Sequence, residues 1–194
     1  MVMQAEEQKY YTLEDYLELE VNSQEKHEYI NGEIVLMPGG MPNHNLIIGN
    51  FYAALNFALK RQPYFVFFSD QRLWIPQEPI YTYPDILVVE GALQLQEGRK
   101  DTITNPVMIA EVLSNSTEGY DRGNKFKFYR TIPSFQEYVM IDQYSMHVER
   151  YYKTEPHQWI FSEYDSAESI LALHTVPCEI SLADLYDKVD FEQE

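Results

Sequence analysis

The sequence is poor in cysteine, in basic residues and in long apolar runs, and each shortage excludes a class of protein. A single cysteine, Cys178, excludes an internal disulfide and indicates a reducing compartment. No apolar run approaches the length needed to span a bilayer. The N-terminus, MVMQAEEQKYY, lacks the basic region and apolar core of a secretory signal. We therefore expect a cytoplasmic protein with no membrane partner.

Positive charge is scarce: 14 lysines and arginines face 31 acids, for a net charge of −17. This balance opposes non-specific binding to nucleic acid, because phosphate contacts need local positive charge. It leaves room for a small basic patch or bridging metal ions. The side chains that could form such a patch around a site are Lys60, Arg61, Arg122, Lys125, Lys127 and Arg130.

Glycine and proline are also few, with 8 and 10 residues, and 45% of the chain is apolar. This composition is typical of globular proteins, and 194 residues suit one domain with a sizeable core. No repeat, low-complexity segment or linker divides the chain, so we predict a single domain over residues 1–194.

Hydrophobic periodicity and turn residues predict an order of elements. Thr12 to Asp15 resembles a capping box before a short helix, and Asn31-Gly32 predicts a β-hairpin. Asn43 can cap a long amphipathic helix that ends near Lys60. The remaining expected elements are strands at 64–68, 71–75, 84–89, 107–110, 135–141, 146–152 and 158–164, a polar loop at 91–105, a helix between 114–117 and 132, and a short helix at 181–188. This order predicts an α/β or α+β fold with a mixed β-sheet flanked by helices.

Several familiar catalytic motifs are missing from the sequence. It contains no glycine-rich phosphate loop, no nucleophile elbow and no paired-cysteine metal motif. The five histidines are scattered, with none at zinc-ligand spacing. Cys178 follows Val176-Pro177 among apolar residues and is expected to be an inert packed thiol.

Two carboxylates remain beside predicted buried strands. Asp85 precedes the apolar run 86–89, and Glu111 follows the run 107–110. If these strands pair, both acids converge at one rim of the sheet. Two carboxylates about 4 Å apart repel by roughly 4 kcal/mol at an effective dielectric near 20, so such a pair shares a proton or holds a cation. Mg²⁺ suits the site because it takes one or two carboxylates and keeps its waters.

Two further residues could complete this site. Lys125, on the helix after Glu111, could orient or help deprotonate an attacking water, and Glu28 in the hairpin could be a further ligand. A metal ion that polarises a phosphoryl oxygen and activates water would hydrolyse a phosphodiester. The competing interpretation is that Glu111 leaves the core at a strand end and that Lys125 is a solvated helix residue.

Segments from Tyr11 to Asp142 carry a family resemblance. They are YTLEDYLELE, HEYINGEIVLMPG, Asn43-His44, YPDILVVEG, IAEVLSNST, DRGNKFKFYR and FQEYVMID. Pro84-Asp85 followed by Glu111-Val112-Leu113 resembles the PD-(D/E)XK nuclease superfamily, whose core is a restriction-endonuclease-like mixed sheet flanked by helices. The chain is most similar to the Uma-two family of restriction-type endonucleases.

The resemblance implies a role for each matching residue. It makes Asp85 and Glu111 the metal ligands and Glu28 a supporting acid. The position two residues after Glu111 holds Leu113 where the superfamily has lysine, and the family's lysine on the helix matches Lys125. Lys127 is the alternative, but it points to a different helix face.

Three other residues match the family motifs, and we assign them structural roles. Asp121 is expected to be a helix-start acid that favours the helix dipole. Tyr129 is expected to pack with a polar tip, and His44 to act as a cap or structural residue.

These features predict a Mg²⁺-dependent DNA endonuclease that could also use Mn²⁺. Cutting both DNA strands would favour a two-fold homodimer. A catalytically silent protein of the same fold, acting as a binding or interaction module, is the alternative, because fold alone does not determine function. A glycosidase with two carboxylates fits less well, although the 16 tyrosines are compatible with one.

Overall fold

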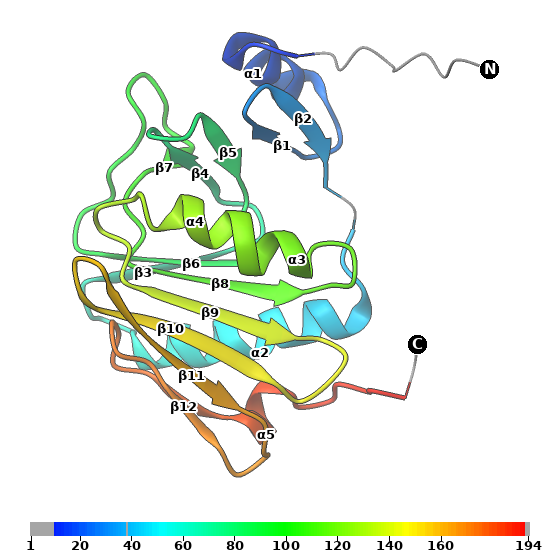
Figure 1. Cartoon of the computed structure of the whole chain (residues 1–194), viewed down its shortest axis with the longest axis vertical. Coiled ribbons are helices and arrows are strands. Elements are labelled where there is room, and N and C mark those ends of the chain that lie inside the picture. Colours follow the sequence, from blue (N-terminus) through cyan, green and yellow to red (C-terminus); the bar gives the residue numbers. More distant parts are fainter. Residues whose placement is uncertain (1–9, 38, 193–194) are drawn as a thin grey trace.

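A computed structural model describes residues 10–37 and 39–192 of the chain. Its main element is a six-stranded mixed sheet in the order β11-β10-β9-β8-β6-β3 (Figure 1). Strands β8 and β9 are parallel, and the other neighbouring strands are antiparallel. The strands are β3 (Tyr64–Phe68), β6 (Ile86–Glu90), β8 (Met108–Leu113), β9 (Glu137–Asp142), β10 (Val148–Glu155) and β11 (Gln158–Tyr164).

A smaller five-stranded sheet, ordered β2-β1-β5-β4-β7, forms the upper part of the molecule in Figure 1. Its strands are β1 (His27–Ile30), β2 (Glu33–Leu36), β4 (Arg72–Ile75), β5 (Ile80–Thr82) and β7 (Thr102–Ile103). The predicted hairpin is confirmed: Asn31 and Gly32 join β1 to β2 with φ of 51° and 96°. Both residue types tolerate this left-handed conformation, which the turn requires.

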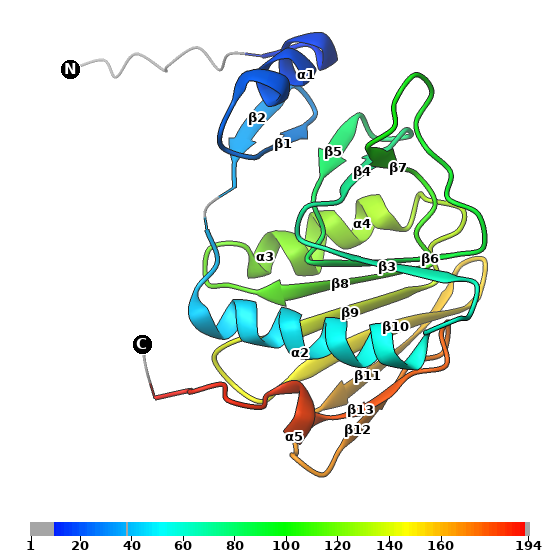
Figure 2. The ribbon, with the colours of Figure 1, turned by 180° about the vertical axis from the view of Figure 1, so that it is seen from behind.

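Helices cover both faces of the main sheet. Helix α2 (Pro42–Ala58) lies on one face, in front of the strands in Figure 2. On the other face, α3 (Glu118–Tyr120), a π-helical turn η1 (Asp121–Lys125) and α4 (Phe126–Tyr129) form one continuous segment. The remaining elements are α1 (Leu13–Asn22), β12 (Ile170–Ala172), β13 (Glu179–Ser181) and α5 (Leu182–Leu185). None of the helices in the described residues is long and apolar enough to cross a membrane.

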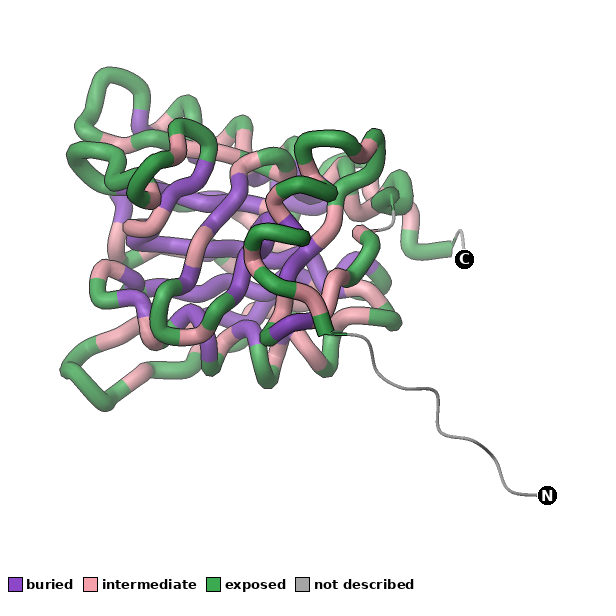
Figure 3. Tube along the Cα trace, turned by 90° about the horizontal axis from the view of Figure 1, so that it is seen from above, coloured by how far each residue is buried: buried purple, intermediate pink, exposed green. Residues whose placement is uncertain are grey.

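Strand β8 shows how the sheet separates two apolar cores. Its residues are all buried, and successive side chains point to opposite faces. Met108, Ala110 and Val112 belong to the core that contains α2 and α5. Ile109 and Leu113 belong to the core that contains α4 and strands of the smaller sheet. Figure 3 shows the buried residues gathered in the interior of the molecule and the exposed residues on the segments around it.

The capping of the helices differs from the predictions. Helix α2 begins at Pro42, and its N-cap is Met41; the Asn43 side chain instead donates to the carbonyl of Asp190 at 2.7 Å. The next helix starts within the expected range 114–117: Thr117 is the N-cap of α3, although its side chain makes no cap hydrogen bond. Proline suits the first helical position since its missing N–H would have no partner there.

The strand boundaries also differ. Strand β8 continues to Leu113, so Glu111 lies inside a strand and not at its end. The predicted polar loop 91–105 contains β7, and β5, β12 and β13 were not predicted. These are strands of two or three residues, whose pairing depends on tertiary neighbours more than on their own sequence.

Candidate functional site

Asp85 and Glu111 are neighbours across strands β6 and β8. The antiparallel register pairs Ile86 with Ala110, which places Asp85 next to Glu111 on the same face of the sheet. The backbone amide of Asp85 donates to Oε2 of Glu111 at 3.3 Å. The amide of Val112 donates to Oδ2 of Asp85 at 2.7 Å. The structure therefore shows the predicted convergence of the two acids.

Lys125 joins this pair from the end of η1. Its Nζ lies 3.2 Å from Oε1 of Glu111 and 3.9 Å from Oε1 of Glu28. Only 9% of Lys125 is exposed, so the interpretation of a solvated helix lysine is wrong. Lys127, the alternative lysine, is exposed and does not face the acids. The π-helical geometry is of interest here because such turns occur frequently at functional sites.

Asp121 also faces Lys125, a contact that was not predicted. Its Oδ1 lies 3.0 Å from Lys125 Nζ, and the residue is 2% exposed. Beyond this ion pair, Oδ1 has no hydrogen-bond partner within the described chain. Asp121 does lie in the first turn of η1, as expected, and in addition forms a buried ion pair with Lys125. The signal in the sequence was the i, i+4 spacing of Asp121 and Lys125, which places opposite charges on one helix face.

Hydroxyl groups complete the contacts of two acids. Tyr129 donates to Oε1 of Glu111 at 2.6 Å, so its polar tip has a more specific partner than we predicted. Glu28 lies in β1 of the smaller sheet, where Thr82 donates to its Oε1. Glu28 is 8% exposed and is brought to Lys125 because α4 lies between the two sheets. The structure thus brings together Asp85, Glu111, Lys125 and Glu28.

His44 approaches the same site from the first turn of α2. Its Nε2 lies 3.2 Å from Oδ1 of Asp85, and both side chains are 18% exposed. The sequence predicts a structural or capping role for His44 and gives no sign of this contact. His44 and Asp85 are more exposed than Glu111 and Lys125, so they form the solvent-facing side of the site.

Burial and neighbouring charges shift the pKa values of the buried groups. Burial raises the pKa of Glu111 to about 8, the charge of Lys125 opposes this increase, and Asp85 adds to it. Burial alone would lower the pKa of Lys125, but the charges of Glu111 and Glu28 outweigh it and hold this pKa well above its ordinary value. Burial also raises the pKa of Tyr129. The raised pKa favours the charged form of Lys125, which supports the first of its two expected roles, orienting a water, over the second, deprotonating it.

The donor set suits a hard divalent cation. Glu28, Glu111 and Asp121 lie within 4.0 Å of Lys125, and Asp85 adds a further carboxylate beside Glu111. One lysine does not balance four buried or half-buried acids, so the site has room for more positive charge. Among the described residues, no group of three or more His, Cys, Asp or Glu side chains is arranged to hold a metal. Asp85 and Glu111 could supply the one or two carboxylates that Mg²⁺ usually takes while it keeps several waters.

The predicted basic patch around the site is only partly present. His44 lies in the first turn of α2, and Lys60 comes just after the last turn of this helix. The sixteen residues that separate them correspond to about 24 Å along a helix. Lys60 and Arg61 are therefore too far away. Arg122 pairs with Glu149 at 2.7 Å and with Glu118 at 2.8 Å, so its charge is neutralised locally.

A mixed sheet between helices, with two carboxylates and a lysine meeting beside it, is the arrangement of a nuclease-type α/β fold. A similar fold occurs in a crystal structure described as "a putative nuclease belonging to DUF820" from Anabaena variabilis. The two chains are 21% identical with a TM-score of 0.74, over 91% of this chain and 97% of the other. The Uma2 family model, "putative restriction endonuclease", matches residues 13–184, and the chain belongs to this family.

Two Synechocystis proteins are similar in sequence. The uncharacterized protein sll1609 is 41% identical over 155 residues, which cover 80% of this chain and 88% of that protein. The uncharacterized protein slr1290 is 34% identical over 159 residues, which cover 81% and 82%.

Proposed function

We propose that this protein is a metal-dependent endonuclease that hydrolyses phosphodiester bonds of DNA. The observation that supports this proposal most strongly is the meeting of Asp85, Glu111 and Lys125, which come from the residue before β6, from β8 and from η1. Membership of a family described as restriction endonucleases supports the same chemistry. Asp85 and Glu111 would hold Mg²⁺ or Mn²⁺, and the ion would polarise a phosphoryl oxygen and lower the pKa of a bound water.

The other side chains would position and balance charge. The raised pKa of Lys125 favours its charged form, which would stabilise the negative charge that develops on the phosphate during hydrolysis. Tyr129 would hold Glu111 in one orientation through its hydroxyl. His44 would orient Asp85 from the exposed side, and Glu28 and Asp121 would hold Lys125 from the two other directions.

The test compares three proteins in a plasmid-nicking assay with Mg²⁺ or Mn²⁺. The parent should nick supercoiled plasmid, and Asp85→Asn should lose this activity by a factor of about a hundred or more. Asparagine keeps the size of the side chain and can still accept from the Val112 amide. Asp165→Asn is the matched control, because Asp165 is exposed and makes no ion pair within the described residues.

Metal binding is measured separately by calorimetry and by the shift of the melting temperature on addition of Mg²⁺ or Mn²⁺. The parent and Asp165→Asn should bind the ion, and Asp85→Asn should bind it much more weakly. Equal nicking by parent and Asp85→Asn would refute the assignment of this site. Ion binding to the parent without any nicking would instead favour a silent protein of this fold.

A further inference from the structure

A hollow lies at the C-terminal end of α4, and none of the carboxylates of the candidate site lines it. Its volume is about 220 Å³, and it lies between α4 and the β10–β11 hairpin. Five of the side chains that line it can bind an anion or stack on a ring: Lys127, Arg130, Lys153, His157 and Trp159. In a chain with a net charge of −17, this concentration of positive charge requires an explanation.

The cations of this pocket have no acidic partners in the described chain. No carboxylate of the described residues lies within 4.0 Å of the side-chain nitrogens of Lys127, Arg130 or Lys153. Basic residues elsewhere are mostly paired, as Arg72 is with Asp101 and Arg122 with Glu149. An unpaired cluster of like charges is unfavourable to the fold alone, so it is suited to attract an anionic ligand.

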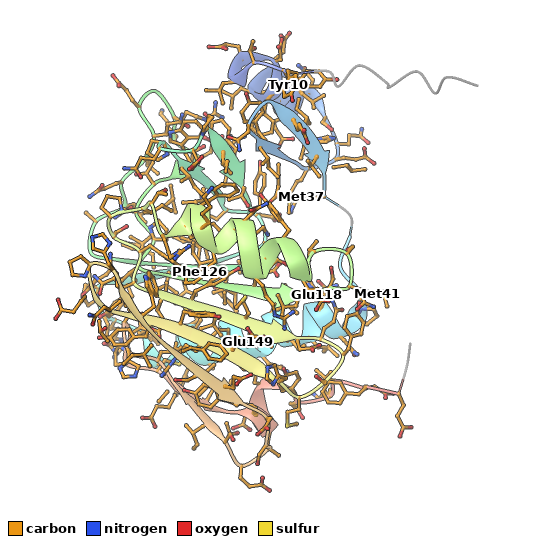
Figure 4. The ribbon with its side chains drawn as sticks, viewed as in Figure 1. Tyr10, Met37, Met41, Glu118, Phe126 and Glu149 are labelled. Carbon is orange, nitrogen blue, oxygen red and sulfur yellow. The ribbon has the colours of Figure 1, made fainter. Side chains whose placement is uncertain are left out.

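The aromatic wall of the pocket is held in place from behind. Trp159 is half-buried, and its ring centroid lies 5.2 Å from that of Phe126 and 5.7 Å from that of Phe135. Figure 4 labels Phe126 on α4, from which it packs against strands β9 to β11. Arg130 lies over the same Phe126 ring at 4.7 Å and donates from Nε to the Phe126 carbonyl. Its terminal N–H groups are left to bind a ligand.

We propose that this pocket binds one nucleotide of a single-stranded nucleic acid. A backbone phosphate would contact Arg130 and Lys153, and the base would stack on Trp159. Basic grooves with aromatic side chains are the usual means of binding single strands. The volume is below the range of about 300 to 1,000 Å³ typical of pockets that enclose a whole small ligand, which suits one unit of a longer chain. This inference rests on the proposed function, because it gives the same nucleic acid a second contact.

The test measures the binding of a fluorescently labelled ten-nucleotide oligothymidylate by anisotropy, in EDTA so that no hydrolysis occurs. The double variant Arg130→Gln/Lys153→Gln should bind about tenfold more weakly than the parent. The affinity of the variant should also depend less steeply on salt. In a plot of log association constant against log salt concentration, the slope should be shallower by about 0.7 for each phosphate that the variant no longer binds. Tryptophan fluorescence should be quenched by the oligonucleotide in a Trp74→Phe background, where Trp159 is the remaining tryptophan.

Lys60→Gln/Lys188→Gln is the matched control, since it removes the same charge near α2 and α5 on the opposite face of the sheet. The control variant should bind the oligonucleotide with an affinity within about twofold of that of the parent, because it keeps the cations of the pocket. Equal affinities of the two double variants would overturn the proposal. The proposal would also be overturned if poly-glutamate competed as strongly as the unlabelled oligonucleotide. It would be overturned as well if a duplex of equal length bound more tightly than the single strand and lost this binding in the pocket variant.

The failure of this inference and that of the proposed function are distinguishable. Suppose that Asp85→Asn binds the oligonucleotide as tightly as the parent and that Arg130→Gln/Lys153→Gln binds it more weakly. Nucleotide binding in the pocket is then supported, whatever the nicking assay shows. Suppose instead that the pocket variant binds the oligonucleotide as tightly as its control, that the parent nicks plasmid and that Asp85→Asn does not. Nucleotide binding in the pocket is then refuted, and the proposed nuclease activity is supported.

Discussion

Asp85 and Glu111 are each held by the backbone of the other's strand. The Asp85 amide donates to Glu111 at 3.3 Å, and the amide of Val112, next to Glu111, donates to Asp85 at 2.7 Å. Two carboxyl groups are thus placed side by side by main-chain groups, which cannot move without disturbing β6 and β8. This preorganisation is expected of a site in which the carboxylates act together on one cation.

Removal of the buried lysine should be strongly destabilising. Lys125→Met leaves Glu111, Asp121 and Glu28 without their cation, so the free energy of unfolding should fall by about 3 to 5 kcal/mol in urea denaturation. Lys127→Met, an exposed neighbour on the helix, should change it by less than about 0.5 kcal/mol. Similar losses for both variants would show that Lys125 does not balance the acids.

Coupling between Lys125 and Glu111 can be measured by a double-mutant cycle. Glu111→Gln should recover part of the stability lost in Lys125→Met, because it removes one of the unbalanced charges. The expected interaction energy is about 1 to 3 kcal/mol. An interaction energy near zero would contradict the contact of 3.2 Å between the two side chains.

The hydroxyl of Tyr129 should contribute through Glu111. Tyr129→Phe removes a hydrogen bond of 2.6 Å to a buried carboxylate, so the free energy of unfolding should fall by about 1.5 to 3 kcal/mol. Tyr52→Phe is the control, since the Tyr52 ring packs on Phe68 and its hydroxyl has no hydrogen bond in the described residues. Equal stability of Tyr129→Phe and the parent would argue against this bond.

Acid should remove the stabilisation that Asp101 provides. Hydrogen bonding to Arg99, with further help from Thr102 and Arg72, lowers the pKa of Asp101 from 3.8 to about 2. Because the pKa is lower in the folded state, this stabilisation is complete above about pH 5 and disappears as the pH falls through 2. The side chain is 56% exposed, so we expect about 1 kcal/mol after screening.

The measurement for Asp101 is the difference in urea midpoint between the parent and Asp101→Asn. This difference should be present at pH 7 and should shrink steadily from pH 4 downwards. Asp165→Asn should show no such trend, because Asp165 has no cationic partner in the part of the chain that the structure describes. A difference between parent and Asp101→Asn that is constant down to pH 2 would contradict the assigned contacts.

The single thiol should react slowly in the native protein. Cys178 is 4% exposed, and burial, together with Glu179, raises its pKa to about 11. At pH 8, a thiol-specific reagent should label the native protein at least about a hundredfold more slowly than the urea-unfolded chain. Equally rapid labelling of both forms would show that Cys178 is accessible, contrary to its place in the core beside α2.

Part of the fold and site could be predicted locally. The hairpin at Asn31-Gly32, the long helix and the apolar strands that carry Asp85 and Glu111 depend on turn chemistry and periodicity within short windows. The pairing of the two strands could be proposed because both are apolar runs bounded by acids. The burial of Asp121 could not be predicted, because it depends on Tyr138 and the helix geometry around it, which no short window contains.

The amino-acid sequence by itself determined the longer elements and their order, the excess of acidic residues and the residue types that make metal-assisted hydrolysis plausible. Only the tertiary structure decided that Lys125 is buried, that His44 contacts Asp85, and that Arg130, Lys153 and Trp159 share one pocket. The physical reason is that turns and periodicity act between near neighbours in the chain. Strand register, helix rotation and the docking of α4 between two sheets depend instead on the joint burial of residues far apart in sequence.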